Sequence, residues 1–202
     1  MSLLETHVIS ALAWLSFGFG HSVLASSPAK DRFRPKLGAY YRLSYNIFAV
    51  VHILAVWLIG YFTFASAASF TVPEMARLAM GVMYILGVIF LLIALRSYDL
   101  GRLAGTTQIR NFKGGIDEPE DEPLNIKGLH AYVRHPLYAC VYVILWAGAQ
   151  DDFGLATAIW GSAYLAVGTY FEERRLLSLY GGSYQAYQTK VPALIPWRGR
   201  GG

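Results

Sequence analysis

The chain has 202 residues, of which 55% are hydrophobic and only 15% are charged, whereas soluble domains carry about 25% charged residues. Its charges fall in blocks separated by long uncharged stretches, which argues against an ordinary soluble domain and predicts a membrane protein. The net charge of +4 comes without a basic stripe interleaved with aromatic residues, so we expect no nucleic-acid partner.

Three apolar stretches in the first half each reach the roughly 20 residues that a spanning helix needs: Leu3–Ala25, Leu43–Ala68 and Ala76–Leu95. The first lacks a basic leader and is soon followed by a similar stretch, which predicts a span and not a cleaved signal peptide. Two shorter runs, Pro136–Gln150 and Phe153–Phe171, predict a short helical hairpin. The expected fold is an all-α integral membrane protein of about five transmembrane helices, the last two forming this hairpin.

Lysine and arginine gather in three polar segments. Pro28–Arg42 holds five, Arg96–Arg134 holds six, and the tail after Phe171 holds five, which leaves only Arg77 elsewhere. With five spans, these three segments share one side of the membrane. The positive-inside rule then predicts a multi-pass cell-membrane protein with its amino terminus outside and its carboxyl terminus in the cytoplasm. The same basic residues are expected to contact anionic membrane lipid.

We expect one domain in three parts: a three-helix anchor (1–97), a cytoplasmic loop (98–134), and the hairpin with a C-terminal tail (135–202). The acidic middle of the loop, Gly114–Pro123, is rich in glycine and proline, which is typical of a mobile surface loop. Cys140, the only cysteine, lies in an apolar run, so we expect neither a disulfide nor a cysteine-based metal site. No metal and no particular oligomeric state are predicted.

Arg134-His135-Pro136-Leu137-Tyr138 is the first polar group that points to chemistry. Proline is favoured at the first position of a helix, so a helix is predicted to begin at Pro136 with Arg134 and His135 at its amino end. Such an end attracts carboxylate or phosphate groups. The alternative is a structural role, with the basic side chains reaching lipid headgroups and Tyr138 lying at the membrane interface.

Glu172-Glu173, after the last apolar run, and the tyrosine-rich tail are the other two groups. One glutamate is expected to bind a cationic ligand group such as an ammonium, unless both only pair with Arg174 and Arg175. In the tail, Tyr180–Tyr187 contains two glycines that predict a helix end, and Val191–Trp197 is apolar, contains prolines, and suits the membrane interface. Tyrosine faces are also suited to hold a sulfonium cation.

Taken in order, R-H-P-L-Y, the apolar hairpin, E-E-R, Y-G-x-x-Y-x-x-Y and V-P-x-x-I-P resemble the isoprenylcysteine carboxyl methyltransferase superfamily over about Leu124–Trp197. The resemblance implies membrane enzymes that use S-adenosylmethionine. In the first half, similarity to the NnrU branch, which includes methanethiol S-methyltransferases, rests on a short set of residues. They are Phe19–Ala25, Lys30, Tyr98-Asp99-Leu100, Gly105 and Gln108.

The resemblance implies a cytoplasmic cofactor-binding region. Its expected residues are Gln108, Leu124, Asn125, His130, His135, Pro136, Leu137, Tyr138 and Glu172, with Glu122–Asn125 contributing backbone contacts. The arginine that contacts the prenylated substrate in the eukaryotic enzymes has Gly168 at its position here. This departure argues against an isoprenylcysteine substrate.

The leading hypothesis is methyl transfer from S-adenosylmethionine to a small or lipophilic acceptor, with a thiol such as methanethiol as one candidate. The candidate catalytic residues are His21, Asn46 and Arg134, with Tyr45 beside them. An ordinary interhelical hydrogen bond equally explains His21, Tyr45 and Asn46. The alternative is a haem-binding membrane isomerase or redox protein of the NnrU type, with His21 and His52 as the pair of ligands. A non-catalytic membrane adaptor is a third reading.

Overall fold

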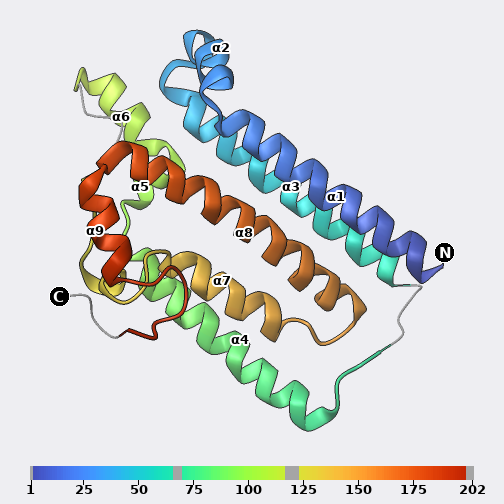
Figure 1. The fold of residues 1–202 in the computed structure, drawn as a ribbon. Helices are drawn as coiled ribbons and strands as arrows, with labels where there is room; N and C mark the ends of the chain where they lie inside the picture. The colour runs from blue at the N-terminus through green and yellow to red at the C-terminus, as the bar shows by residue number, and fades with distance from the viewer. Residues whose placement is uncertain (1, 66–69, 117–122, 199–202) are drawn as a thin grey trace. The chain divides into compact units, whose positions relative to one another are not determined.

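A computed structural model describes residues 2–65, 70–116 and 123–198 (Figure 1). Over these ranges the chain is helical, without a strand, and its one isolated bridge joins Thr71 to Asp151. The predicted all-α fold is confirmed. Two compact units are formed, residues 1–69 with 98–120 and residues 70–97 with 121–202. Most of the acidic segment predicted to be mobile (117–122) lies outside the described residues.

The first unit is built on two long helices, α1 (Leu3–Ala25) and α3 (Tyr41–Phe64), which lie side by side (Figure 1). The basic segment that connects them, for which no helix was predicted, contains α2 (Ser27–Leu37) and the 3-10 turn η1 (Gly38–Tyr40). Ser26 helps to start this helix, because its hydroxyl accepts a hydrogen bond from Ala29 N and caps α2.

Two short helices complete this unit, α5 (Leu100–Ala104) and α6 (Thr106–Gly114). The Asp99 carboxylate caps α5 by accepting from Arg102 N at 2.8 Å. Gly105 separates the two helices with a φ of 98°, and a Cβ there would lie 2.6 Å from Leu43 N. A glycine is therefore required both for the turn and for its close approach to α3.

The second unit contains α4 (Glu74–Leu95), η2 (Gly128–Ala131), α7 (Pro136–Ala147), α8 (Asp152–Tyr180) and α9 (Gly182–Lys190). Gly87 lets α4 approach α7 closely, since a Cβ there would meet the Ile144 side chain at 2.9 Å. The helix predicted to begin at Pro136 does so. The predicted hairpin is present as α7 and α8, joined by a short turn, and Tyr142 and Trp146 donate hydrogen bonds to Ser162 across it.

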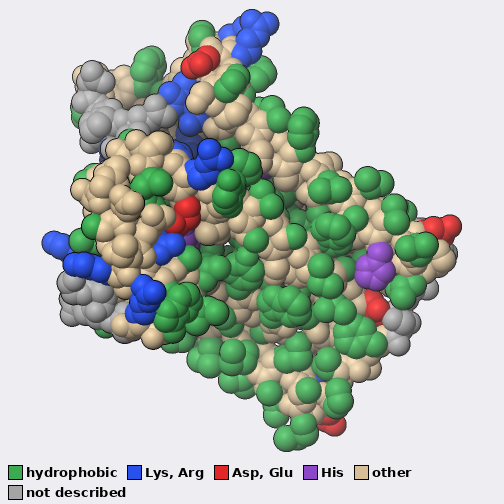
Figure 2. Space-filling model, in the orientation of Figure 1, with side chains coloured by type: hydrophobic (Ala, Val, Ile, Leu, Met, Phe, Trp, Pro, Cys, Tyr) green, Lys and Arg blue, Asp and Glu red, His purple; other side chains and the backbone are tan. Residues whose placement is uncertain are grey.

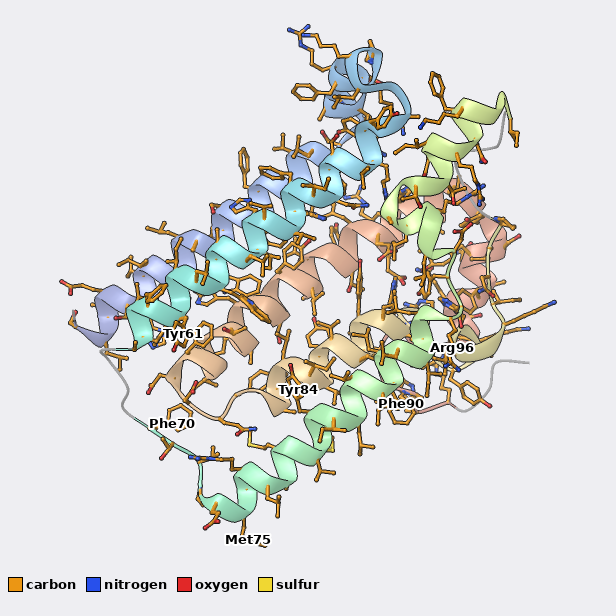
Figure 3. All side chains as sticks on the ribbon, turned by 180° about the vertical axis from the view of Figure 1, so that it is seen from behind. Tyr61, Phe70, Met75, Tyr84, Phe90 and Arg96 are labelled. Carbon is orange, nitrogen blue, oxygen red and sulfur yellow. The ribbon has the colours of Figure 1, made fainter. Side chains whose placement is uncertain are left out.

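Close contacts fix the register of α4 and α7. Gly87 lies against Ile144, whereas Gly148 lies near Tyr84, so the two helices run antiparallel. By this register the start of α7 is level with the end of α4 at Arg96 (Figure 3). At the other end, Phe70 N donates to the buried Asp152 carboxylate at 3.0 Å and holds the α7–α8 turn.

Helix α8 is longer than expected. The apolar run ends at Phe171, but the helix continues to Tyr180, because the residues that follow Phe171 are mostly good helix formers. It ends at Gly181, whose φ is 54°, at one of the two glycines predicted to stop it. Glu172 and Glu173, which follow the last apolar run, therefore lie inside α8 and not at the end of a helix.

Three helical segments are long and apolar enough to cross a membrane: α1, the continuous Ser27–Phe64 segment and α4. Hydrophobic side chains cover much of the visible surface of α4 (Figure 2), and Figure 3 shows Met75, Tyr84 and Phe90 along it. Helix α7 is apolar but short, and glycine, serine and threonine lower the hydropathy of α8. Three to four apolar helices are thus compatible with a membrane protein, and the count of five stays a prediction.

Gly154→Ala is expected to destabilise the second unit by about 1–3 kcal/mol, the usual cost of overpacking. A Cβ at this position would lie 2.1 Å from the carbonyl oxygen of Gly148, so the α7–α8 turn must open to admit it. Thermal unfolding of the detergent-purified protein measures the effect. Gly168→Ala is the matched control, because a Cβ there meets nothing within 4 Å and alanine favours the helix. Equal melting temperatures for the two variants would contradict the prediction.

Candidate functional site

A network centred on the carboxylate of Glu173 lies at the amino end of α7. Arg134 donates two parallel hydrogen bonds to this carboxylate, from Nε to Oε1 at 2.9 Å and from Nη2 to Oε2 at 3.0 Å. His135 Nε2 lies 2.6 Å from Oε1 of the same group. Two-pronged arginine–carboxylate pairs are strong and fix geometry, so Glu173 sets the orientation of both basic side chains.

Helix α9 supplies two further donors to Glu173. The Tyr184 hydroxyl donates to Oε1 at 2.8 Å, and Gln188 Nε2 donates to Oε2 at 2.5 Å. Tyr184 and Gln188 are four residues apart in α9, so their side chains lie on the same face of the helix. The turn at Gly181 folds α9 back along the end of α8 and brings this face to Glu173. Tyr184 is 1% exposed and packs with Tyr187 and Val191 in a small apolar core.

The tail after α9 holds the backbone of the same two basic residues. Arg134 N donates to Pro192 O at 2.9 Å, and His135 N donates to Ala193 O at 3.0 Å. Arg134 Nη1 also donates to Val191 O at 2.5 Å. The motifs R-H-P-L-Y and V-P-x-x-I-P are therefore in direct contact, although more than fifty residues separate them in the chain.

The second glutamate of the pair has a different environment. Glu172 Oε2 lies 3.5 Å from His135 Nδ1, and the His135 ring stacks on Tyr138 with centroids 5.5 Å apart. Within the described residues Oε2 is buried and makes no hydrogen bond of good geometry. Burial acts to raise the pKa of Glu172, but His135 and Tyr138 lower it, so the group is a carboxylate whose Oε2 can accept from a ligand donor.

Charge in the network is set by these contacts. Burial opposes the charged form of His135, but Glu172 and Glu173 outweigh it and raise the pKa of the imidazole to about 9. Burial also acts to raise the pKa of Glu173, yet hydrogen bonds from its four partners hold that pKa well below the ordinary value. The pair therefore exists as imidazolium and carboxylate at neutral pH.

His130 is buried beside this network. Its Nδ1 lies 3.2 Å from Arg134 O, and its own carbonyl oxygen accepts a hydrogen bond from the Tyr187 hydroxyl at 2.5 Å. Burial lowers the pKa of His130, so this imidazole is neutral at neutral pH. The two histidines thus carry different charges within one site.

The structure brings together most of the residues expected at the cofactor. His135, Pro136, Leu137, Tyr138 and Glu172 meet where α7 begins, with His130 next to them. Leu124 packs against the small apolar core, whereas Asn125 is exposed and accepts from Lys127 N. Glu122 lies outside the described residues. Gln108 belongs to the first unit, where Nε2 donates to Arg102 O and Oε1 is buried without a partner among the described residues.

The candidate catalytic residues His21 and Asn46, with Tyr45 beside them, also lie in the first unit. The Tyr45 hydroxyl is hydrogen-bonded to His21 Nε2 between α3 and α1. Asn46 Nδ2 donates to Leu103 O at 2.8 Å and to Ala104 O at 3.0 Å, which ties α3 to α5. The amide of Asn46 is thus occupied by backbone carbonyls, while His21 and Tyr45 form a polar pair in a largely apolar helix interface.

The histidine pair considered for haem is not favoured. Phe17 packs against both imidazoles, with its ring centroid 5.6 Å from that of His21 and 5.6 Å from that of His52. His52 Nε2 is hydrogen-bonded to Ser16 at 3.1 Å. A phenylalanine side chain therefore contacts both of the rings that would have to face the iron.

Sequence reasoning missed the central position of Glu173. The salt bridges considered for the glutamates used Arg174 and Arg175, but Glu173 pairs with Arg134, and Arg174 lies over the Tyr170 ring. The contributions of Tyr184 and Gln188 were missed as well. Their four-residue spacing on a helix beside the Glu-Glu pair was the available signal.

The chain is similar to known methyltransferases over part of its length. The chain is 41% identical to methanethiol S-methyltransferase 1 of Bradyrhizobium diazoefficiens over 71 residues, which are 35% of this chain and 25% of that protein. It is 30% identical to the methanethiol S-methyltransferase of Crocosphaera subtropica over 125 residues, 58% of this chain and 46% of that protein. These similarities support the isoprenylcysteine carboxyl methyltransferase-like superfamily.

The similarity to methanethiol S-methyltransferases supports the methanethiol branch of this superfamily. A protein-S-isoprenylcysteine O-methyltransferase of Schizosaccharomyces pombe is also similar, with 35% identity over 85 residues, 38% of this chain and 34% of that protein. The matched segments span less than half the length of each of these relatives. No family model matches the chain. No solved structure matches it either.

Proposed function

We propose that this chain is a membrane methyltransferase that uses S-adenosylmethionine to methylate a small thiol such as methanethiol. The names of its relatives support the methyltransferase class and the thiol acceptor. The observation that carries the donor assignment is the buried Glu172 Oε2, which lies beside an imidazolium and lacks a hydrogen bond within the described residues. An ammonium group on a ligand would complete this carboxylate.

The residues at the start of α7 fit the charges of S-adenosylmethionine. Glu172 would hold the ammonium of its amino acid part. The carboxylate of that part would meet the amino end of α7, where His135 makes no side-chain cap. The ring of Tyr138, stacked on His135, offers a face for a cation. When bound, the donor supplies a methyl group activated by its positively charged sulfur.

We propose that Arg134 is a positioning residue and not a catalytic one. Its guanidinium makes four hydrogen bonds, two to Glu173 and two to backbone carbonyl oxygens at Gln188 and Val191, so it mainly shapes the site. Asn46 has the same kind of role for α5. His21, hydrogen-bonded to Tyr45, is our candidate for taking the proton from the acceptor thiol, because the thiolate is the nucleophile in methyl transfer.

The remaining sequence expectations are part of this proposal. The site end of the second unit faces the cytoplasm, and the amino terminus of the chain lies outside. The basic residues of α2 contact anionic lipid, consistent with the lysine and arginine side chains visible over α2 in Figure 2. Five spans and the three-part division at residues 97 and 134 complete the expected topology.

Glu172→Gln is expected to weaken S-adenosylmethionine binding by about 10–100-fold, the value of one charge-assisted hydrogen bond. Isothermal calorimetry on the detergent-purified protein measures the dissociation constant. Glu74→Gln is the matched control, because it makes the same chemical change at an exposed position at the start of α4. Unchanged affinity in Glu172→Gln would contradict the assignment of this carboxylate.

Donor and acceptor are tested separately. Saturable binding of S-adenosylmethionine that is lost in His135→Ala supports the donor site. If the wild type does not bind S-adenosylmethionine, the proposed function is wrong. Transfer of a labelled methyl group from the donor to methanethiol, detected as labelled dimethyl sulfide, tests the acceptor. In the His21→Gln variant, donor binding is expected to persist while transfer is lost.

A further inference from the structure

The tail that follows α9 forms a loop closed at both ends. Near its start Val191 is 1% exposed, and the next two carbonyls accept hydrogen bonds from the backbone at Arg134 and His135. At its far end Arg198 Nη1 donates to Thr189 O at 2.6 Å, which returns the tail to α9. Trp197 N donates to Ile195 O at 2.9 Å and tightens the tip. The loop is therefore ordered by its own contacts.

The tip of this ordered loop is apolar and uncovered. Ile195 is 66% exposed, Trp197 is 65% exposed, and Pro196 between them is exposed as well. Removing a large apolar side chain from water stabilises a protein by about 1.5–3 kcal/mol. Three consecutive apolar residues that a closed loop holds outward do not gain this stabilisation unless a non-aqueous environment covers them.

The depth of the tip follows from the register of the second unit. His135 N donates to Ala193 O, so the tail passes directly over the start of α7. That start is level with the end of α4, a helix long and apolar enough to cross a membrane. Trp197 is four residues beyond Ala193, so its backbone lies within about 14 Å of this level. The end of a spanning helix marks the boundary between hydrocarbon and headgroups.

We propose that Ile195-Pro196-Trp197 inserts into the headgroup–acyl boundary of the bilayer and anchors the C-terminal tail there. Tryptophan is enriched at this boundary, because its ring is apolar and its N–H remains hydrogen-bonded. Since the same tail binds the backbone at Arg134 and His135, lipid contact at the tip steadies these two residues. The inference depends on α4 spanning the membrane and not on the proposed methyl transfer.

Tryptophan fluorescence in lipid nanodiscs tests this inference. The chain has five tryptophans, so the emission of Trp197 is taken as the difference between the wild type and Trp197→Phe. Nanodiscs of ordinary phosphatidylcholine are compared with nanodiscs whose acyl chains carry bromine, a contact quencher. Acrylamide quenches from the water side. The expected result is a blue-shifted Trp197 emission that loses most of its intensity to bromine and little to acrylamide.

Two results would overturn the inference. Quenching by acrylamide alone places Trp197 in water, and resistance to both quenchers shows that protein, from this chain or a partner, covers it. Moving the reporter, with Ile195→Trp in the Trp197→Phe background, guards against misfolding of a single variant. This second reporter is expected to show the same quenching by bromine, because both side chains belong to the same tip.

Discussion

Replacing Glu173 by glutamine is expected to destabilise the second unit by about 3–5 kcal/mol, the cost of removing one partner from a buried ion pair. Arg134 and Glu173 have side chains only 12% and 17% exposed. The Glu173 carboxylate also makes hydrogen bonds with His135, Tyr184 and Gln188. An amide presents one oxygen in place of two and no charge. Thermal and denaturant unfolding of the purified protein in one detergent measures the loss.

Two comparisons distinguish this network effect from a general loss of charge. Glu74→Gln removes an exposed carboxylate from the first turn of α4 and is expected to cost less than about 1 kcal/mol. In a double-mutant cycle, Arg134→Met and Glu173→Gln are expected to be strongly non-additive, because each variant leaves the other partner unpaired. Additive losses in that cycle would show that the two side chains act independently.

The helices were predictable where local signals set them. The apolar run Leu3–Ala25 has the same bounds as α1, and the proline at position 136 begins α7 because its missing N–H costs nothing there. Gly181 ends α8 because a left-handed φ favours glycine. Each of these boundaries depends on residues next to one another in the chain, which the sequence displays directly.

Boundaries set by polar helix formers were harder to predict. The apolar run ends at Phe171, but the helix does not, because backbone hydrogen bonding continues through the charged residues that follow. The same reasoning missed α2, whose sequence is basic and contains Pro35 but is capped by Ser26. Hydropathy predicts which segments are suited to a membrane; it does not predict where a helix ends.

The choice of partners in the site depended on tertiary structure. From the sequence, Arg174 and Arg175 were the nearest bases to Glu173, but adjacent residues on a helix point in different directions. Arg134 is 39 residues away in the chain and reaches Glu173 because the α7–α8 hairpin brings the two together. The motif order indicated which residues share a site, whereas the hairpin register decides which atoms meet.

The stability of the second unit is expected to depend on pH with a maximum near pH 6.5, and His135 sets the alkaline side. Its pKa rises from 6.5 to about 9 in the folded protein. Above pH 6.5 the unfolded chain therefore releases a proton that the folded protein still binds. Stability then falls as the pH rises from 6.5 through 9. The groups that face this imidazole are Glu172, Glu173, Tyr138, Arg134 and His130.

The acid side of the maximum has a different origin. His130 has a lowered pKa, so below pH 6.5 the unfolded chain binds a proton that the buried imidazole of the folded protein does not bind. Stability therefore falls as the pH falls below 6.5. The carboxylates of Glu172 and Glu173, whose pKa values are also lowered, add to the loss as the pH falls below 4.5. Denaturant unfolding between pH 4 and pH 10 measures both sides.

His135→Asn is expected to remove the decline between pH 6.5 and 9 and to leave the decline just below pH 6.5. His130→Gln is expected to do the reverse, and a profile that neither variant alters would place the titrating groups outside this network.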